Sequence, residues 1–93
     1  MKITIDTPRR EVLVGGKSVR LTKREWEILL ALSSVDGKVL DRKQLGAAIN
    51  YGKLDDPRLV DVHVARLRRK IGPDAVITAR SFGYQINRTL ING

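Results

Sequence analysis

The fold is decided by the stretch RLVDVHVARLRRKI, residues 58–71. Its apolar residues recur at i, i+4, i+7 and i+11, which places them on one stripe of a helix with 3.6 residues per turn: Val60, Val64, Leu67 and Ile71. The other side carries a single acid, Asp61, and five cations: Arg58, Arg66, Arg68, Arg69 and Lys70. We therefore predict a helix over 57–71 that packs on one side and presents positive charge on the other.

A short basic hairpin is predicted after this helix. Gly72-Pro73 ends the helix. Two extended runs follow, Val76–Ala79 and Tyr84–Ile86, with Arg80 near the tip between them. A helix followed by a basic hairpin is the element order of a winged helix. A helix with one cationic face also fits the major groove of DNA.

The N-terminal region predicts a small antiparallel sheet. Residues 3–5 alternate apolar and polar side chains, which is typical of a half-buried strand, and Val12 and Val14 recur at the same two-residue period with Leu13 between them. Gly15-Gly16 is a two-residue hairpin signal, because both positions tolerate positive φ. We expect this sheet to occupy residues 1–21.

Capping patterns predict two more helices between the sheet and the cationic helix. Thr22 with Glu25, and Asp41 with Gln44, have the spacing of a capping box. Asp56 would cap the cationic helix, with Pro57 in its first turn. The residues expected to face inward are Trp26, Leu29, Leu30, Leu32 and Ser33 in the first helix, and Leu45, Ala48 and Ile49 in the second.

These elements predict an α+β fold, a winged helix-turn-helix formed by one domain over residues 1–93. Its parts are the N-terminal antiparallel sheet (1–21), a three-helix core (22–71) and a C-terminal β-hairpin wing (76–87). The tail, Asn87–Gly93, is expected to be frayed.

Composition narrows the function. The formal charge of +8 and pI of about 10.5 favour a polyanionic partner, most often nucleic acid, because the charge is clustered. An apolar fraction of 42% is enough for a core.

The chain has no cysteine, so it has neither disulfides nor thiolate metal sites. No apolar run approaches the roughly 18 residues of a membrane span. Met1 leads straight into the strand pattern without a signal peptide.

Other function classes are less well supported. His63 has no second histidine or cysteine near it in the sequence, and no paired acid and base is visible, so we expect no enzyme, metal site or cofactor. A winged-helix protein-interaction module, acting through loop 50–56 with Tyr51 and Leu54, is the alternative to DNA binding. It would respond to a protein partner and not to DNA.

Residues 21–86 resemble a known family, the OmpR/PhoB-type winged-helix DNA-binding (effector) domain of bacterial response regulators in two-component systems. The resemblance is carried by LTKRE (21–25), VLDRKQL (39–45), VDVHV (60–64), RLRRKI (66–71), TAR (78–80) and GY (83–84). Their combination and spacing are specific, whereas any one piece alone would be weak.

The resemblance implies a sequence-specific transcription regulator that binds double-stranded DNA. Helix 57–71 would enter the major groove, where Arg66 would pair with guanine and Val62 would touch a thymine methyl. Arg80 would enter the adjacent minor groove. The other members of the implied DNA-binding set flank this surface or hold the backbone: Arg58, Leu59, His63, Ala65, Arg68, Arg69 and Thr78.

The resemblance also implies partners. Two copies would bind direct repeats head to tail, in the cytoplasm and at the nucleoid. A loop would meet RNA polymerase through Tyr51, Gly52, Lys53, Leu54 and Asp55. Two departures stand out: Ser81-Phe82 replaces the glycine that usually follows the wing arginine, and Asn50-Tyr51 replaces a common tryptophan. These residues contain no receiver domain, which leaves an excised effector domain and a stand-alone regulator both open.

Overall fold

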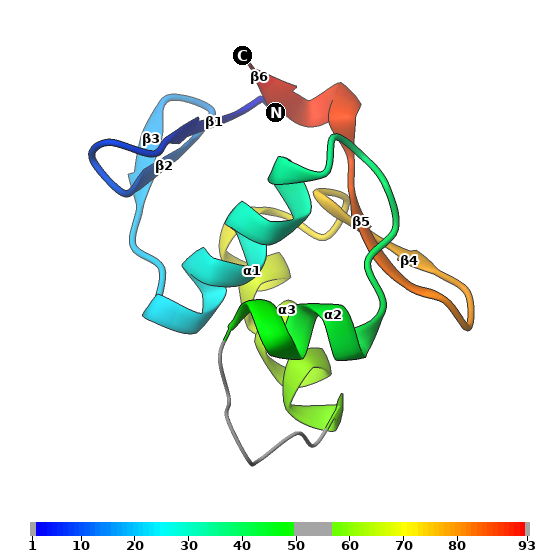
Figure 1. Cartoon of the computed structure of the whole chain (residues 1–93). Coiled ribbons are helices and arrows are strands. Elements are labelled where there is room, and N and C mark those ends of the chain that lie inside the picture. The colour runs from blue at the N-terminus through cyan, green and yellow to red at the C-terminus, as the bar shows by residue number, and fades with distance from the viewer. Residues whose placement is uncertain (1, 50–56, 93) are drawn as a thin grey trace.

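A computed structural model of the chain describes residues 2–49 and 57–92. The elements are β1 (Ile3–Asp6), β2 (Glu11–Val14), β3 (Lys17–Val19), α1 (Lys23–Ser34), α2 (Arg42–Ala48), α3 (Pro57–Ile71), β4 (Val76–Ala79), β5 (Gly83–Ile86), a 3-10 turn (Arg88–Leu90) and β6 (Ile91–Asn92). In Figure 1 the three helices lie between the N-terminal sheet on one side and the β4–β5 hairpin on the other. The predicted winged-helix fold is confirmed, and the wing strands end at Ile86.

The N-terminal sheet has the strand order β3-β2-β1-β6. Its first three strands are antiparallel, as predicted, with Ile3 opposite Val14 and Val12 opposite Val19. Ile3 of β1 and Val12 of β2 are both buried. This side of the sheet therefore contributes to the core.

The prediction of a frayed C-terminal tail is wrong for residues 87–92. β6 pairs with β1 in parallel, with Ile91 opposite Ile3, and the two ends of the chain lie side by side (Figure 1). Leu90 and Ile91 pack against the core, so fraying would expose apolar surface to water. Asn87 caps the 3-10 turn by accepting from the backbone N–H of Thr89. Apolar burial and this cap hold the tail to the sheet.

Both predicted capping boxes are present. Thr22 accepts from the backbone N–H of Glu25 while Glu25 accepts from that of Thr22, and Asp41 and Gln44 make the same exchange. These reciprocal bonds satisfy donors that would otherwise be unpaired at a helix start. They fix where α1 and α2 begin.

The inward faces of α1 and α2 differ from the prediction at several positions. Leu29, Leu32, Leu45 and Ile49 are buried as expected. Trp26, Leu30 and Ser33 are only partly buried, and Ala48 is exposed. The α1 face is rotated toward Glu25 and Ile28, which are exposed to only 1% and 0%. The rotation brings a carboxylate, which sequence reasoning assigned only to the cap, into the interior.

The stripe predicted for α3 is confirmed. Val60, Val64, Leu67 and Ile71 are all buried, and they pack the helix against α1 and α2. The helix ends at Ile71, and Gly72 follows with a φ of +110°, a conformation that side chains disfavour. With one side fixed in the core, the other side of α3 faces outward.

The described ranges, 2–49 and 57–92, contain no helix that is both long and apolar enough to cross a membrane.

Candidate nucleic-acid interface

The outward face of α3 carries the predicted reading residues. Val62 is 44% exposed, although it is a large apolar side chain, and Ala65, Arg66 and Arg69 are exposed around it. Leu59 is partly buried beside this face. The surface thus combines exposed guanidinium donors with small apolar contacts, the chemistry that guanine edges and thymine methyls require.

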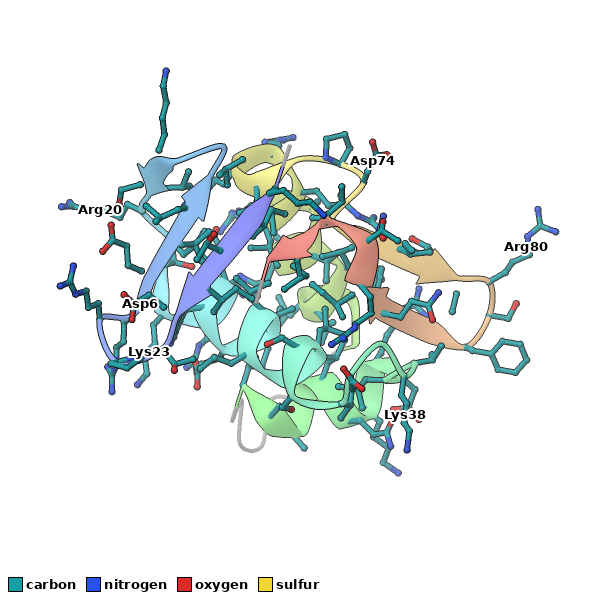
Figure 2. The ribbon with its side chains drawn as sticks, turned by 90° about the horizontal axis from the view of Figure 1, so that it is seen from above. Asp6, Arg20, Lys23, Lys38, Asp74 and Arg80 are labelled. Carbon is teal, nitrogen blue, oxygen red and sulfur yellow. The ribbon has the colours of Figure 1, made fainter. Side chains whose placement is uncertain are left out.

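The tip of the wing projects from the far end of the molecule. Arg80 is exposed and points away from the end of the hairpin (Figure 2). Ser81 occupies the position that is usually glycine in the resembled family, and its φ of +65° is left-handed. Only a small fraction of non-glycine residues adopt that conformation. The departure noted in the sequence therefore keeps the glycine-like backbone of the turn.

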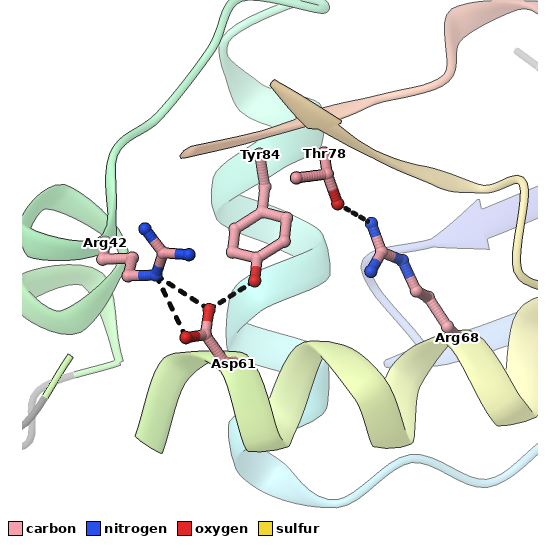
Figure 3. A network of polar contacts seen from close by, with 5 residues as sticks. All are labelled: Arg42, Asp61, Arg68, Thr78 and Tyr84. Atoms are coloured by element: carbon pink, nitrogen blue, oxygen red, sulfur yellow. Dashed lines mark hydrogen bonds and ion pairs between the residues drawn. The ribbon is translucent and has the colours of Figure 1, made fainter. Parts of the chain in front are cut away.

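Arg68 joins α3 to the wing. Its Nε and Nη2 donate to the carbonyl of Val76 at 3.0 and 2.7 Å. Nη2 also donates to Thr78 Oγ1 at 2.7 Å (Figure 3). Its guanidinium carbon lies 5.4 Å from the ring centre of Tyr84, within cation–π range. The resemblance gave Arg68 and Thr78 to the DNA backbone. The structure engages both with each other, and their phosphate contacts stay a prediction.

A second joint links α2, α3 and the wing through Asp61. Nε of Arg42 donates to both carboxylate oxygens of Asp61 at 2.9 and 3.1 Å, and the hydroxyl of Tyr84 donates to Asp61 Oδ1 (Figure 3). Burial and the contact with Asp61 raise the pKa of Tyr84 above 10.0, so its hydroxyl keeps its proton and acts as a donor.

The backbone completes the anchoring of the wing. Leu40 and Tyr84 exchange two hydrogen bonds, N–H of Leu40 to the Tyr84 carbonyl at 2.8 Å and N–H of Tyr84 to the Leu40 carbonyl at 2.9 Å. Gly83 makes this approach possible, because a Cβ there would lie 2.1 Å from the carbonyl oxygen of Leu40. The wing, α3 and the link before α2 therefore form one rigid unit.

Sequence reasoning missed this unit in part. It identified Asp61 only as the lone acid of a cationic helix, and gave Arg42 and Tyr84 no role at the interface. The one feature of the sequence that could have indicated these contacts was the lone acid, Asp61. A carboxylate among arginines that are expected to meet phosphates would oppose binding unless its charge is compensated. Arg42 compensates the charge of Asp61, and the Tyr84 hydroxyl donates a hydrogen bond to it.

The surroundings of Lys70 and His63, two polar residues of α3, bear on whether they can contact DNA. Lys70, a cation of the helix that was not assigned to DNA, donates from Nζ to the buried carboxylate of Glu25 at 2.7 Å. Burial and the cation of Arg66 lower the pKa of His63, against an opposing effect from Glu25. At neutral pH its imidazole is therefore uncharged. A phosphate beside the ring would act in the opposite direction and raise this pKa.

Several predicted residues lie outside the described structure. The proposed polymerase loop, Tyr51 to Asp55, and the cap Asp56 are outside the described ranges. Arg58 lies in the first turn of α3, its side chain is also outside the described part of the structure, and its phosphate contact stays a prediction.

The positive charge is less clustered than the sequence suggested. A pocket beside β2, β3 and the start of α1 is lined by the cations Arg9, Arg10, Arg20 and Lys23, together with Glu11 and Trp26. Arg20 and Lys23 lie at the opposite end of the molecule from Arg80 (Figure 2). Net charge alone therefore does not locate the interface.

In the described ranges, no group of three or more histidine, aspartate or glutamate side chains could hold a metal ion.

Comparison with known sequences places the chain among regulators. The family described as "Transcriptional regulatory protein, C terminal" matches residues 16–86. The transcriptional regulatory protein CseB of Streptomyces avermitilis is 46% identical over 86 residues, which are 91% of this chain and 37% of CseB. The response regulator PmrA of Pseudomonas aeruginosa is 36% identical over 89 residues, 94% of this chain and 40% of PmrA. The chain thus spans well under half the length of these relatives.

Solved structures agree with the sequence match. The AdeR DNA-binding domain in complex with an intercistronic region has a TM-score of 0.83 and 27% identity, covering 94% of this chain and 95% of that one. The Klebsiella pneumoniae RstA DNA-binding domain in complex with the RstA box has a TM-score of 0.81 and 30% identity, covering 92% and 91%. This chain therefore belongs to the family of C-terminal domains of transcriptional regulatory proteins, of the OmpR/PhoB winged-helix type.

Proposed function

We propose that this chain is the sequence-specific, double-stranded-DNA-binding domain of a bacterial transcription regulator. The observation that carries the proposal is the rigid unit of α3 and wing. It has an outward face of Val62, Ala65, Arg66 and Arg69 on the helix, and Arg80 at the end of the hairpin. Family membership and two similar domains solved with DNA support it.

The two parts of the unit suit two grooves. An α-helix fits the roughly 12 Å width of the major groove, where each base pair has a distinct donor and acceptor pattern. A single arginine suits the minor groove, whose negative potential is strongest in A·T-rich tracts. We assign base reading to Arg66 and Val62, and minor-groove insertion to Arg80. Leu59 and Ala65 flank the read bases.

Phosphate contacts would supply most of the affinity. Arg69 is exposed on α3 and is our first choice for a phosphate ligand, with Arg58 next. His63 would add a hydrogen bond. Affinity that comes from phosphate neutralisation falls steeply as salt rises, because bound counterions are released.

The wider setting is proposed from the family. Two copies would bind direct repeats head to tail, and the loop at 51–55 would meet RNA polymerase. The work would be done in the cytoplasm, at the nucleoid. CseB and PmrA are each more than twice as long as the matched region, so signal sensing would belong to a part of the regulator beyond this domain.

In vitro selection from random duplex DNA, sequenced at moderate salt, tests the proposal. It should enrich one motif, as a direct repeat spaced near one helical turn. Binding without enrichment would reduce the domain to a nonspecific basic protein. No binding at all would favour the protein-interaction alternative.

A further inference from the structure

The tip of the wing carries the most exposed large apolar side chain of residues 2–49 and 57–92. Phe82 is 72% exposed, and the next such side chain, Val62, is 44% exposed. A single exposed apolar side chain is common on protein surfaces, so exposure alone assigns no role. The position of Phe82 is what points to one.

Phe82 shares a tight turn with Arg80. The backbone N–H of Phe82 donates to the carbonyl of Ala79 at 2.8 Å and closes a four-residue turn that contains Arg80 and the left-handed Ser81. Arg80 points outward from the end of this turn (Figure 2). A groove that receives the Arg80 side chain therefore also meets the turn that carries Phe82.

The turn is held in place by the hairpin below it. β4 and β5 pair along their full length, from Val76 opposite Ile86 to Ala79 opposite Gly83. The bonds between Tyr84 and Leu40, and between Arg68 and Thr78, tie that hairpin to the rest of the fold. The backbone that carries the ring is therefore already ordered, so binding has to order only the ring itself, which favours a contact role.

The minor groove offers partners for an aromatic ring. Proteins that enter it often insert apolar side chains that pack on the sugars and partly unstack a base step. Pyrimidine–purine steps unstack most easily. We propose that Phe82 is a second DNA-contacting residue of the wing, which enters the minor groove beside Arg80 and opens one base step. The inference rests on the proposed DNA binding, and it adds selectivity for a TA or CA step beneath the wing.

The test compares variants on the duplex obtained by selection. Affinity is measured by fluorescence anisotropy, and 2-aminopurine placed at the step beneath the wing reports unstacking. The variants are Phe82→Ala, Phe82→Leu and Ile77→Ala. Ile77 is the matched control, because it is also an exposed apolar residue of the hairpin, 38% exposed, but lies in β4 away from the tip. Phe82→Ala should leave thermal unfolding unchanged, since the ring lies mostly in water.

The expected result is that Phe82→Ala weakens binding about tenfold. The 2-aminopurine signal gained on binding should disappear, and replacing the TA or CA step should no longer matter. Phe82→Leu should keep part of the wild-type affinity and signal, and Ile77→Ala all of both. Unchanged affinity, fluorescence and step preference for Phe82→Ala would overturn the inference and leave the ring to a protein partner. If Arg66→Ala still weakens binding in that case, the proposed function stands and only the inference fails. A wild-type domain that binds no duplex would overturn both.

Discussion

Nη2 of Arg68 in α3 donates a 2.7 Å hydrogen bond to Thr78 Oγ1 in the wing. Nε and Nη2 of the same guanidinium also hold the Val76 carbonyl. Helix and hairpin are therefore positioned relative to one another before DNA arrives, and the domain does not have to order them on binding. This makes Arg68 a positioning residue by geometry.

Replacing Arg68 by Ala should lower the free energy of unfolding by about 1–3 kcal/mol, because the charged hydrogen bonds to the wing are lost. Urea denaturation measures this. Arg69→Ala is the matched control, since Arg69 is the next residue of the same helix and is exposed. It should change stability by less than about 0.5 kcal/mol, and should flatten the salt dependence of DNA binding by about one unit. Equal stability of the two variants would return Arg68 to a purely phosphate-binding role.

The Glu25–Lys70 pair predicts a loss of stability in acid. Burial raises the pKa of Glu25, but the hydrogen bonds from Lys70 and Thr22 outweigh burial and leave the pKa below its ordinary value of 4.5. Because the folded pKa is the lower one, the contribution is fully present above the unfolded pKa and is lost as pH falls through the folded pKa. Urea midpoints measured across this range should fall with pH in the wild type. In Glu25→Gln, which retains the capping geometry, they should fall less.

Lys70→Met tests the same pair from the other side. It leaves the carboxylate, which is 1% exposed, without its cation. Removing one partner of a fully buried pair costs about 3–5 kcal/mol. Lys70 is 35% exposed, so a smaller loss of about 2 kcal/mol is expected after allowing for solvent screening. Because burial would then dominate and raise the Glu25 pKa above its unfolded value, the sign of its contribution should reverse: the variant should gain stability as pH falls, where the wild type loses it. A variant as stable as the wild type at pH 7 would show that the ion pair contributes nothing.

Gly83→Ala should disrupt the wing. The new Cβ would lie 2.1 Å from the Leu40 carbonyl oxygen, and the φ of +140° is unfavourable for alanine. Gly16→Ala is the control, because Gly16 has a φ of +85° but a Cβ added there would meet nothing within 4 Å. The control should lose about 1–2 kcal/mol from backbone conformation alone. Gly83→Ala should lose clearly more, together with the amide protection of Leu40 and Tyr84 in hydrogen exchange. Equal losses would mean that the Leu40 contact is unimportant.

Arg66→Ala should weaken DNA binding by about 1–3 kcal/mol and relax base preference at one position, because a bidentate contact with guanine reads that base. Selection repeated with the variant gives the base preference, and anisotropy titration gives the affinity. If base preference is untouched, Arg66 is not the reading residue, and Val62 becomes the next position to replace.

The sequence was sufficient to predict those elements that depend on the spacing of apolar residues and on helix capping. The stripe of Val60, Val64, Leu67 and Ile71 predicted α3, and Thr22 with Glu25 predicted the start of α1. These signals are short in range, so they appear directly in the order of residues. The face of α1 was misplaced, because the depth of Glu25 depends on Lys70, 45 residues away.

The strand β6 and the role of Arg68 were also not predicted, because both depend on contacts between residues that are far apart in the sequence. β6 needs Ile3 as a partner at the other end of the chain, and the two residues Ile91–Asn92 alone are too short to predict a strand. The role of Arg68 depends on where the β4 backbone passes. An arginine on a helix surface has the same sequence signature whether it meets a phosphate or a carbonyl. Long-range geometry, and not composition, separates those outcomes.

The most direct test of DNA binding through α3 and the wing is to map the bound surface by NMR. The selected duplex is titrated into the labelled domain, and backbone amide shifts are followed. We expect the largest changes on the outward face of α3, from Leu59 to Arg69, and on the wing turn from Thr78 to Phe82. Changes concentrated around Arg9, Arg20 and Lys23, with α3 and the wing unmoved, would contradict this assignment.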